Sequence, residues 1–366
     1  MSTSNLQDLN QVSIGYIPIS NSLNSPGDKR RFPYYAYKRN LHFEIADPSK
    51  NYDLVVLTQG ADLSVWSQER SERPVIVYDF IDSYLAIPKS NLKGLSRGLA
   101  KFLSGQSKYL KLNYWNAIAD MCSRADAVVC STEEQKSDIL KYCSNVHIIL
   151  DAHSCVARSI KTDYTCNRPF RLVWEGLPQN IGSLRLLSIA LNQLRDAYPI
   201  EVHIVTDQFY NRFLGKYGRS NILNLAKKMF SDVHFHEWNE STVSDIICSC
   251  DLAVIPLDLS DPFAAGKPEN KLLLLWRMGM PVITSSTPAY LRAMNSAGMN
   301  YTAKDDQDWL ALLMKLIQNY DYREKAGLMG KTYVQNKYSE TNLLAQWDSL
   351  FATLQFQIRD SQKLSL

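Results

Sequence analysis

Short runs of β-branched and other apolar residues alternate with longer segments of helical periodicity along almost the whole chain. Such runs are typical of buried strands, and strands separated by helices favour parallel sheets that are covered on both faces. The runs of the first half are Val12–Ile17, Leu54–Leu57, Val75–Tyr78, Ala127–Cys130 and Val146–Leu150. Those of the second half are Arg171–Trp174, Val202–Val205, Val233–Phe235, Leu252–Ile255 and Pro281–Thr284. The sequence therefore predicts an α/β fold.

The strands fall into two series, because residues 152–168 have neither a helical nor a strand period and separate them. Ser123–Ser131 and Ser249–Pro256 resemble each other, since both end a helix, pass an aspartate and enter a buried strand. We therefore expect two Rossmann-like domains, at residues 1–160 and 168–340, that face each other across a cleft. The helical spacing beyond Glu340 predicts a C-terminal helix, within residues 341–366, that packs back across the domain junction.

The composition excludes several classes of protein. The chain has 366 residues, more than one ordinary core accommodates, and its net charge of +3 is too small to indicate nucleic-acid binding. The first ten residues lack the pattern of a secretory signal, and no apolar run approaches the roughly 18 residues of a membrane span. The seven cysteines form no C-x-x-C pair, so we expect reduced cysteines in a cytoplasmic protein.

The strongest candidate for chemistry is the polar loop Gly266–Lys271, which opens an apolar helix. Amides at a helix N-terminus attract phosphate. Lys267 and Lys271 are four residues apart, so both ammonium groups could face one anion from a single helical turn. Glu269 could accept hydrogen bonds from sugar hydroxyls, and Asn270 can donate and accept. The alternative is a capped surface helix with solvated lysines.

Three motifs around this loop point to a known family. Lys267–Leu273 (KPENKLL) is followed by Met278–Ser286 (MGMPVITSS) and by Pro288–Tyr290 (PAY). This succession resembles the donor-binding segment of GT-B fold glycosyltransferases, above all the group 1, glycogen-synthase-like type of surface-polysaccharide biosynthesis. The resemblance covers residues 245–295 and extends more weakly over 165–245. In the first half it rests on the order of the strands and on Ala125–Ser131.

The resemblance implies a substrate and its contacts. The C-terminal domain would hold a nucleotide-diphosphate sugar (a UDP-, GDP- or dTDP-sugar), and the N-terminal domain a glycan or lipid-linked acceptor, without an obligatory metal or other cofactor. Lys267 and Lys271 would hold the diphosphate, while Glu269 and Asn270 would contact the sugar or the ribose. Glu269 is also a catalytic candidate.

Two departures from the family pattern leave the function open. The better-known members carry two glutamates, where this chain has Gly266 and Leu274. They also tend to carry an arginine and a lysine in the turn that is Trp174–Gly182 here, which has no positive charge. A retaining or inverting outcome is therefore not predicted. Two alternatives remain: a non-catalytic binding or scaffold protein of a polysaccharide assembly, and a sugar-nucleotide epimerase of the same fold.

Two further residues of the C-terminal domain are candidate donor contacts. Gly176 follows a predicted strand and would let the backbone approach a ligand closely, unless it only forms a tight turn. Trp238 lies in a loop that the resemblance places near the nucleotide base, with packing as the alternative. His234 and His236 alternate along the preceding strand, but their spacing matches no familiar metal site, so we expect packing and no metal.

In the N-terminal domain a basic segment follows the first strand. Gly27, Lys29, Arg30 and Arg31 lie within Ser25–Phe32, which we expect to be a loop that faces the cleft. The three cations could contact donor phosphate or an anionic acceptor. A plain basic surface loop is the alternative.

Two carboxylates lie at the carboxyl end of the strand Val75–Tyr78. A carboxylate in this position can orient or deprotonate an acceptor hydroxyl. Asp79 is expected to cap the turn, which makes Asp82 the catalytic candidate.

Residues 89–112 contain six lysines and arginines, no acidic residue, and leucines and a phenylalanine at helical spacing. A basic amphipathic helix of this kind can lie on an anionic membrane surface, where lipid-linked acceptors are found. The alternative is a solvated helix whose apolar face packs on the core of the N-terminal domain.

Overall fold

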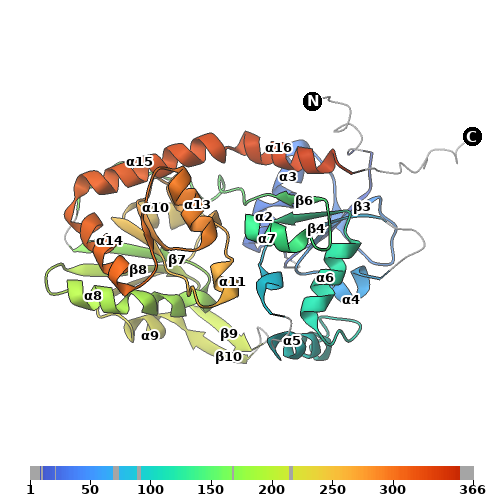
Figure 1. Cartoon of the computed structure of the whole chain (residues 1–366), viewed down its shortest axis with the longest axis horizontal. Helices are drawn as coiled ribbons and strands as arrows, with labels where there is room; N and C mark the ends of the chain where they lie inside the picture. Colours follow the sequence, from blue (N-terminus) through green and yellow to red (C-terminus); the bar gives the residue numbers. More distant parts are fainter. Residues whose placement is uncertain are drawn as a thin grey trace, which may run out of the picture. The chain divides into compact units, whose positions relative to one another are not determined.

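The computed structural model describes residues 9, 11–20, 22–68, 74–88, 92–166, 169–213 and 217–354. They form two compact units (Figure 1), each with a six-stranded sheet. Unit 1 contains the described residues up to Ala152 and those from Glu340 onward, and unit 2 contains His153–Ser339. Every strand pairing within the two six-stranded sheets is parallel. The α/β architecture that the alternating runs predict is confirmed.

The sheet of unit 1 reverses its strand order once. Its strands are β1 (Ile14–Ile17), β2 (Glu44–Ile45), β3 (Leu54–Thr58), β4 (Val75–Asp79), β5 (Ala127–Cys130) and β6 (Val146–Ile148). They lie in the order β2-β1-β3-β4-β5-β6. The order reverses between β1 and β3, so the topological switch point of this sheet lies at their carboxyl ends.

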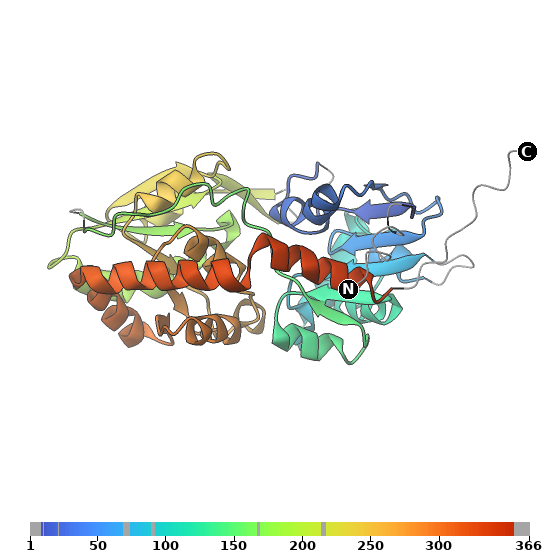
Figure 2. The same ribbon diagram turned by 90° about the horizontal axis from the view of Figure 1, so that it is seen from above.

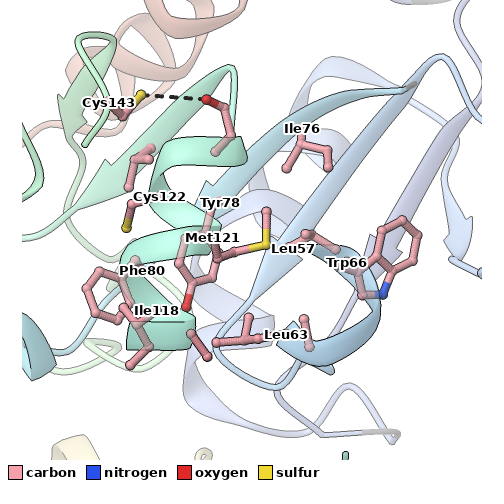
Figure 3. Packing of buried hydrophobic residues seen from close by; sticks show 14 of the residues in the cluster. Leu57, Leu63, Trp66, Ile76, Tyr78, Phe80, Ile118, Met121, Cys122 and Cys143 are labelled. Carbon is pink, nitrogen blue, oxygen red and sulfur yellow. Dashed lines mark hydrogen bonds between the residues drawn. The ribbon is translucent and has the colours of Figure 1, made fainter. Parts of the chain in front are cut away.

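Helices cover both faces of this sheet. They are α2 (Pro26–Arg30), α3 (Phe32–Arg39), α4 (Leu63–Trp66), the 3-10 helix η1 (Tyr84–Ala86), α5 (Leu92–Leu103), α6 (Tyr114–Arg124), α7 (Glu133–Ile139) and α16 (Glu340–Phe351). Alternate residues of β3 belong to two core clusters, one with α4 and α6 and one with α3 and α16. Figure 3 shows the first cluster, in which Leu57, Ile76 and Tyr78 of the sheet meet Ile118 and Met121 of α6. Burial on both faces explains why these strands are continuous apolar runs.

Helix α16 (Figure 2) returns the chain to unit 1. Its apolar residues at helical spacing are buried. Trp347 and Phe351 both stack on Tyr35 of α3, with ring centroids 5.8 and 5.4 Å from that of Tyr35, respectively. Asp348 accepts a hydrogen bond from the Tyr35 hydroxyl at 2.9 Å and pairs with Arg39. The predicted C-terminal helix is therefore present and covers a face of the unit 1 sheet. Residues 355–366 of the predicted segment lie outside the described residues.

The sheet of unit 2 has the strand order of a dinucleotide-binding fold. Its strands are β7 (Phe170–Glu175), β8 (Ile200–Thr206), β11 (Val233–Glu237), β12 (Leu252–Ile255), β13 (Val282–Ser285) and β14 (Thr302–Ala303). They lie in the order β11-β8-β7-β12-β13-β14. Numbered along the chain, this is the order 3-2-1-4-5-6 of Rossmann folds, whose switch point lies between the first and fourth strands. In unit 2 these strands are β7 and β12.

The helices of unit 2 connect these parallel strands, except α14 and α15, which follow the last of them. They are η2 (Pro178–Leu187, 3-10), α8 (Ser188–Leu194), α9 (Ile222–Lys227), α10 (Val243–Cys248), α11 (Pro262–Ala265), α12 (Asn270–Arg277), α13 (Pro288–Ser296), α14 (Asp306–Gln318) and α15 (Tyr320–Lys337). Helix α12 ends shortly before Gly279, which takes the positive φ of 75° that is common just after a helix. Among the described residues, no helix combines the length and the apolar character needed to cross a bilayer.

Four short strands were not predicted from the sequence. β2 and β14 have two residues each, and β9 (Phe209–Phe213) and β10 (Tyr217–Asn221) pair only with each other, as an antiparallel ribbon. Two residues are too few to show a period, and β10 is mostly polar.

The segment between the two strand series is attached to unit 2. Lys161 Nζ donates hydrogen bonds to the carbonyl oxygens of Cys248 and Cys250 at 3.2 and 2.7 Å. The Tyr164 hydroxyl donates to the Gly279 carbonyl oxygen at 2.9 Å. Residues from 153 onward are therefore an integral part of unit 2, although they have no regular secondary structure up to residue 166.

Candidate functional site

The switch point of unit 2 is where a ligand is expected in a sheet of this order. β7 ends at Glu175 and is followed by Gly176, and β12 ends at Ile255. The chain that follows β12 forms α11 and then α12, the helix that the polar loop opens. The candidate residues of this loop therefore belong to the connection between β12 and β13, which begins at the switch point.

Lys271, in the first turn of α12, rests on the carboxyl end of β7. Its ammonium group donates a hydrogen bond to the carbonyl oxygen of Glu175 and lies 3.7 Å from the carboxylate of the same residue. It also lies 5.5 Å from the centre of the Trp174 ring. The side chain remains 26% exposed. A partly exposed cation thus lies at the switch point, held by groups from which a side-chain rotation can release it.

Gly176 is in immediate contact with this lysine. A Cβ atom at position 176 would lie 2.7 Å from Lys271 Nζ and 2.7 Å from the Trp174 ring, so only glycine allows this approach. Its N–H donates to the carbonyl oxygen of Val205 at 3.2 Å and thus serves the β7–β8 pairing. The structure brings Gly176 and Lys271 together, which their separation of 95 residues in the sequence does not reveal.

Lys267 does not share a helical turn with Lys271. α12 begins at Asn270, so Lys267 precedes the helix, and its ammonium group lies 4.6 Å from the centre of the Phe263 ring. The prediction that both lysines face one anion from one helical turn is therefore wrong in its geometry. Asn270 is the first residue of α12, where the helix dipole favours negative charge.

Glu269, at the N-cap of α12, is 8% exposed. The pKa of Tyr338 is raised mainly by burial and next by the charge of Glu269. Tyr338 is also hydrogen-bonded to Glu269. Burial and the same charge raise the pKa of Tyr290. Glu269 therefore lies among tyrosines inside unit 2 and contributes to the anchoring of the helix start, which leaves little of it accessible to a sugar.

The two positions at which the family carries glutamates differ in their surroundings. Gly266 ends α11 and is half-buried. Leu274 lies in α12 and is 4% exposed. At position 274 an apolar side chain fills a core position of unit 2, where a charged group would need a partner.

Trp238 lies at the same edge of the sheet but two strands away from β7. It directly follows β11, and its N–H donates to the carbonyl oxygen of Thr206 at the end of β8, at 3.2 Å. The side chain is half-buried. The residue is thus at the carboxyl edge, as a base contact requires, and not at the switch point itself.

The basic segment of unit 1 is helical rather than a loop. Pro26–Arg30 form α2, and the buried carboxylate of Asp28 accepts hydrogen bonds from the Tyr16 hydroxyl at 2.8 Å and from the Ile19 N–H at 2.8 Å. Asp28 thereby holds the chain that follows β1, a role that the sequence analysis missed. Gly27 is half-buried against Ile19. The two cations of α2 are Lys29, which is exposed, and Arg30, which is half-buried.

Arg31 is a structural residue. Its guanidinium group is 1% exposed and donates to Asp79 at distances of 2.7 to 2.9 Å and to Asp151 at 3.0 Å. Burial raises the pKa of Asp79, whereas Arg31 opposes that effect. The expected phosphate contact of Arg31 and the expected turn cap of Asp79 are both replaced by this ion pair, which ties α3 to the ends of β4 and β6.

Asp82 lies in the turn between β4 and η1. Its carbonyl oxygen accepts a hydrogen bond from Gln135 Nε2 at 3.1 Å, and the same amide donates to the Phe80 carbonyl oxygen at 2.6 Å. The buried Gln135 therefore fixes this turn. The Asp82 side chain is half-buried at the carboxyl end of the sheet.

A polar cluster on unit 2 was also missed. Among the described residues, one group of three, Glu201, His203 and His234, has the side-chain types and distances that could hold a metal ion. From the sequence, His234 was paired with His236 instead, and His203 and Glu201 were not considered. All seven cysteines of the chain are free thiols, as predicted.

Comparisons with known proteins give relatives by structure only. No family model and no curated protein sequence matches this chain. HepE of Anabaena, determined in complex with UDP and glucose, matches 94% of this chain over 100% of its own length, with a TM-score of 0.64 and 10% identity. Sucrose-phosphate synthase of Thermosynechococcus elongatus matches 88% of this chain over 75% of its own, with a TM-score of 0.57 and 13% identity. The match to TarM covers 81% of this chain and 54% of TarM, with a TM-score of 0.57 and 12% identity.

This chain has the GT-B fold. Its two parallel six-stranded α/β units and its C-terminal helix agree with these glycosyltransferase structures, so the predicted fold class is confirmed. At identities of 10 to 13% the likeness concerns the fold. The chain spans 54% of the length of TarM.

Proposed function

We propose that this GT-B protein is a glycosyltransferase that moves a sugar from a nucleotide-diphosphate sugar to an acceptor hydroxyl in polysaccharide or glycoconjugate biosynthesis. The observation that carries the proposal is the position of Lys271, a partly exposed cation at the switch point between β7 and β12. Ligands of such sheets bind outside the carboxyl ends of the strands at the switch point. A diphosphate there would meet a cation and the start of α12.

The chemistry that Lys271 would support is departure of the nucleoside diphosphate. As the glycosidic bond breaks, negative charge grows on the phosphate oxygens, and a fixed cation lowers the energy of that state more than that of the bound donor. The ammonium group would turn from the Glu175 carbonyl oxygen toward the phosphate. Lys267 and Asn270, which adjoin the same helix start, would contribute further contacts, and Trp238 would approach the base.

A UDP-sugar is the donor to test first. HepE and a variant of TarM were each determined in complex with UDP, and both share this fold. GDP- and dTDP-sugars are the other candidates, and no metal ion is needed in this scheme, because Lys271 and the helix start would supply the positive charge.

We assign the acceptor to unit 1. Asp82 lies at the carboxyl end of β4, where a carboxylate can take a proton from an attacking hydroxyl. Lys29 and Arg30, on α2 after β1, would attract an anionic acceptor such as a lipid-linked glycan. Gly27 lies in the same short helix.

A membrane-facing segment would suit a lipid-linked acceptor, and residues 96–112 of unit 1 have the properties of one. Leu103 is 74% and Leu112 69% exposed, far more than is usual for leucine. Further exposed apolar residues are Leu99, Phe102, Tyr109 and Leu110.

The same segment is basic. It contains Arg97, Lys101, Lys108 and Lys111 and no acidic residue. We propose that this apolar and basic surface lies on an anionic bilayer. Lys89 of the predicted segment lies outside the described residues.

Sedimentation with lipid vesicles tests the membrane contact. The protein should sediment with vesicles that contain phosphatidylglycerol and much less with pure phosphatidylcholine. Leu103→Glu combined with Leu112→Glu should reduce the bound fraction by at least about tenfold, because each carboxylate opposes burial in the interface. Leu140→Glu, at another exposed leucine of unit 1, is the control. Equal binding of the double variant and the control would contradict the membrane contact.

The donor is tested by a thermal-shift screen against UDP, GDP, dTDP, ADP and CMP, followed by transfer assays with the sugar nucleotides that bind. A ligand that binds only the folded state must raise the unfolding temperature. Turnover that Lys271→Ala leaves unchanged would remove the proposed role of this residue. A new sugar epimer formed without acceptor would identify an epimerase, and the absence of any nucleotide binding would favour a scaffold protein.

A further inference from the structure

A second group of polar side chains lies on one face of the unit 2 sheet, where β8 pairs with the edge strand β11. The parallel register places His234 of β11 opposite His203 of β8. Side chains two residues apart on a strand share a face, so Glu201 lies on the same face as His203. Two strands thus present a carboxylate and two imidazoles to one spot.

The distances within this group suit a metal ion. His203 Nε2 lies 3.3 Å from one carboxylate oxygen of Glu201, and His234 Nε2 lies 3.8 Å from the other. One atom from each of the three residues can be chosen so that all lie within 4.8 Å of one another. Zinc bonds of about 2.0–2.2 Å place the ligand atoms of a tetrahedral site roughly 3.3–3.5 Å apart. Small side-chain rotations are therefore enough to close the group around an ion.

We propose that Glu201, His203 and His234 form a binding site for a divalent transition metal ion, with Zn²⁺ as the best match. Two imidazole nitrogens and a carboxylate oxygen are a ligand set that zinc takes in proteins. Asp232 is not part of this group, although its Oδ1 lies 3.2 Å from His234 Nε2; its side chain is 55% exposed and would have to turn toward the ion to give a fourth ligand. The ion would tie the edge strand β11 to β8 and would have a structural role.

His236 would orient the histidine that binds the metal. Its Nε2 lies 3.0 Å from His203 Nδ1, and the two rings stack at 5.2 Å with 12° between their planes. If His203 binds metal through Nε2, its proton must be on Nδ1, from which it would donate to His236. A hydrogen bond to the second ring nitrogen is the usual support of a metal-binding histidine.

One neighbouring charge opposes the cation, and the site is open on one side. Arg171 Nε donates to Glu201 Oε2 at 3.3 Å, which leaves Oε1 on the side of His234. Arg171 therefore weakens binding of a cation through its charge. His203 is 7% exposed, whereas the side chain of His234 is 44% exposed, so an ion can enter from the solvent at His234.

Metal titration of tag-free protein, stripped with a chelator, tests the proposal. Calorimetry with Zn²⁺ should give one ion per chain, and Co²⁺ should give the visible absorption of a four-coordinate site. His234→Ala should weaken Zn²⁺ binding by at least about tenfold without loss of the fold, because this side chain is exposed. His236→Phe should weaken it by about 10- to 100-fold through the lost support of His203.

His42→Ala is the matched control, since His42 is an exposed histidine of unit 1. It should bind Zn²⁺ like the parent, as should Cys166→Ser, which removes the exposed thiol of unit 2. The proposal is wrong if the parent binds no Zn²⁺, or if His234→Ala binds it as tightly as the parent, which would mean an adventitious ion only. Neither result depends on nucleotide binding, so the test is separate from that of the glycosyltransferase proposal.

Discussion

The carboxyl edges of the two sheets carry positive charge in different ways. In unit 1, Arg31 is 1% exposed and is neutralised by Asp79 and Asp151. In unit 2, the side chain of Lys271 is 26% exposed and lies 3.7 Å from the carboxylate of Glu175 at the end of β7. Burial and pairing with two carboxylates make the first cation part of the fold, whereas the second is partly exposed, and we propose that it meets a ligand. The accessibility of the charge, and not its presence, separates the two cases.

The largest expected effect is on stability, from the buried pair. Arg31→Met leaves the carboxylates of Asp79 and Asp151 without their partner, so the free energy of unfolding should fall by about 3–5 kcal/mol. Urea denaturation measures this loss. Arg30→Met, at the neighbouring and half-buried position, should change stability by less than about 1 kcal/mol. If both variants lose the same stability, the distinction between structural and available cations fails.

Two glycines sharpen the comparison. A Cβ at Gly60, in unit 1, would lie 2.3 Å from the backbone oxygen of Pro18, which cannot move alone. Gly60→Ala should therefore cost about 1–3 kcal/mol of unfolding free energy. At Gly176 the neighbours are side chains, one of them the mobile end of Lys271, so Gly176→Ala should cost less stability but should weaken UDP binding. Denaturation and UDP titration of both variants separate the two effects, and the reverse pattern would contradict the account.

Glu175 provides a third test. Its carboxylate lies 3.7 Å from Lys271 Nζ and would oppose a diphosphate at the same place. Glu175→Gln should therefore tighten UDP binding by about two- to fivefold, and more at low ionic strength, because salt screens partly exposed charges. Glu133→Gln, on the surface of unit 1, is the control. Weaker UDP binding by Glu175→Gln would show that the carboxylate contributes to the site.

A further effect, of a similar size, concerns Lys101, a cation of unit 1 with an intermediate degree of burial. Burial, and then Arg97, lower the pKa of Lys101 to about 8, and its ammonium group donates to the Tyr114 hydroxyl at 2.8 Å. Because the folded state disfavours the charged form, this lysine reduces stability below pH 8, and the penalty fades as pH rises toward the unfolded pKa. Lys101→Met should thus raise stability by about 1 kcal/mol at pH 7 and by much less at pH 10. A gain that is independent of pH would contradict the assignment.

The sequence predicts what depends on local pattern. The core strands are predicted correctly because burial on both faces makes them continuous apolar runs. The contact between Gly176 and Lys271 is not predictable, since it joins two crossovers. The sequence gives no sign that Arg31 differs from Lys29, because only the burial of the Arg31 side chain in the structure distinguishes the two. His203 is missed because its partner His234 lies on another strand.

Titration of the purified protein with UDP, by calorimetry and in parallel with Lys271→Met, tests the central claim most directly. The account predicts that the parent binds UDP with a stoichiometry of one, that Lys271→Met binds at least about tenfold more weakly, and that the two unfold within about 1 kcal/mol of each other. Equal affinities, or no binding by the parent to any nucleoside diphosphate, would contradict a diphosphate site at the β7–β12 switch point.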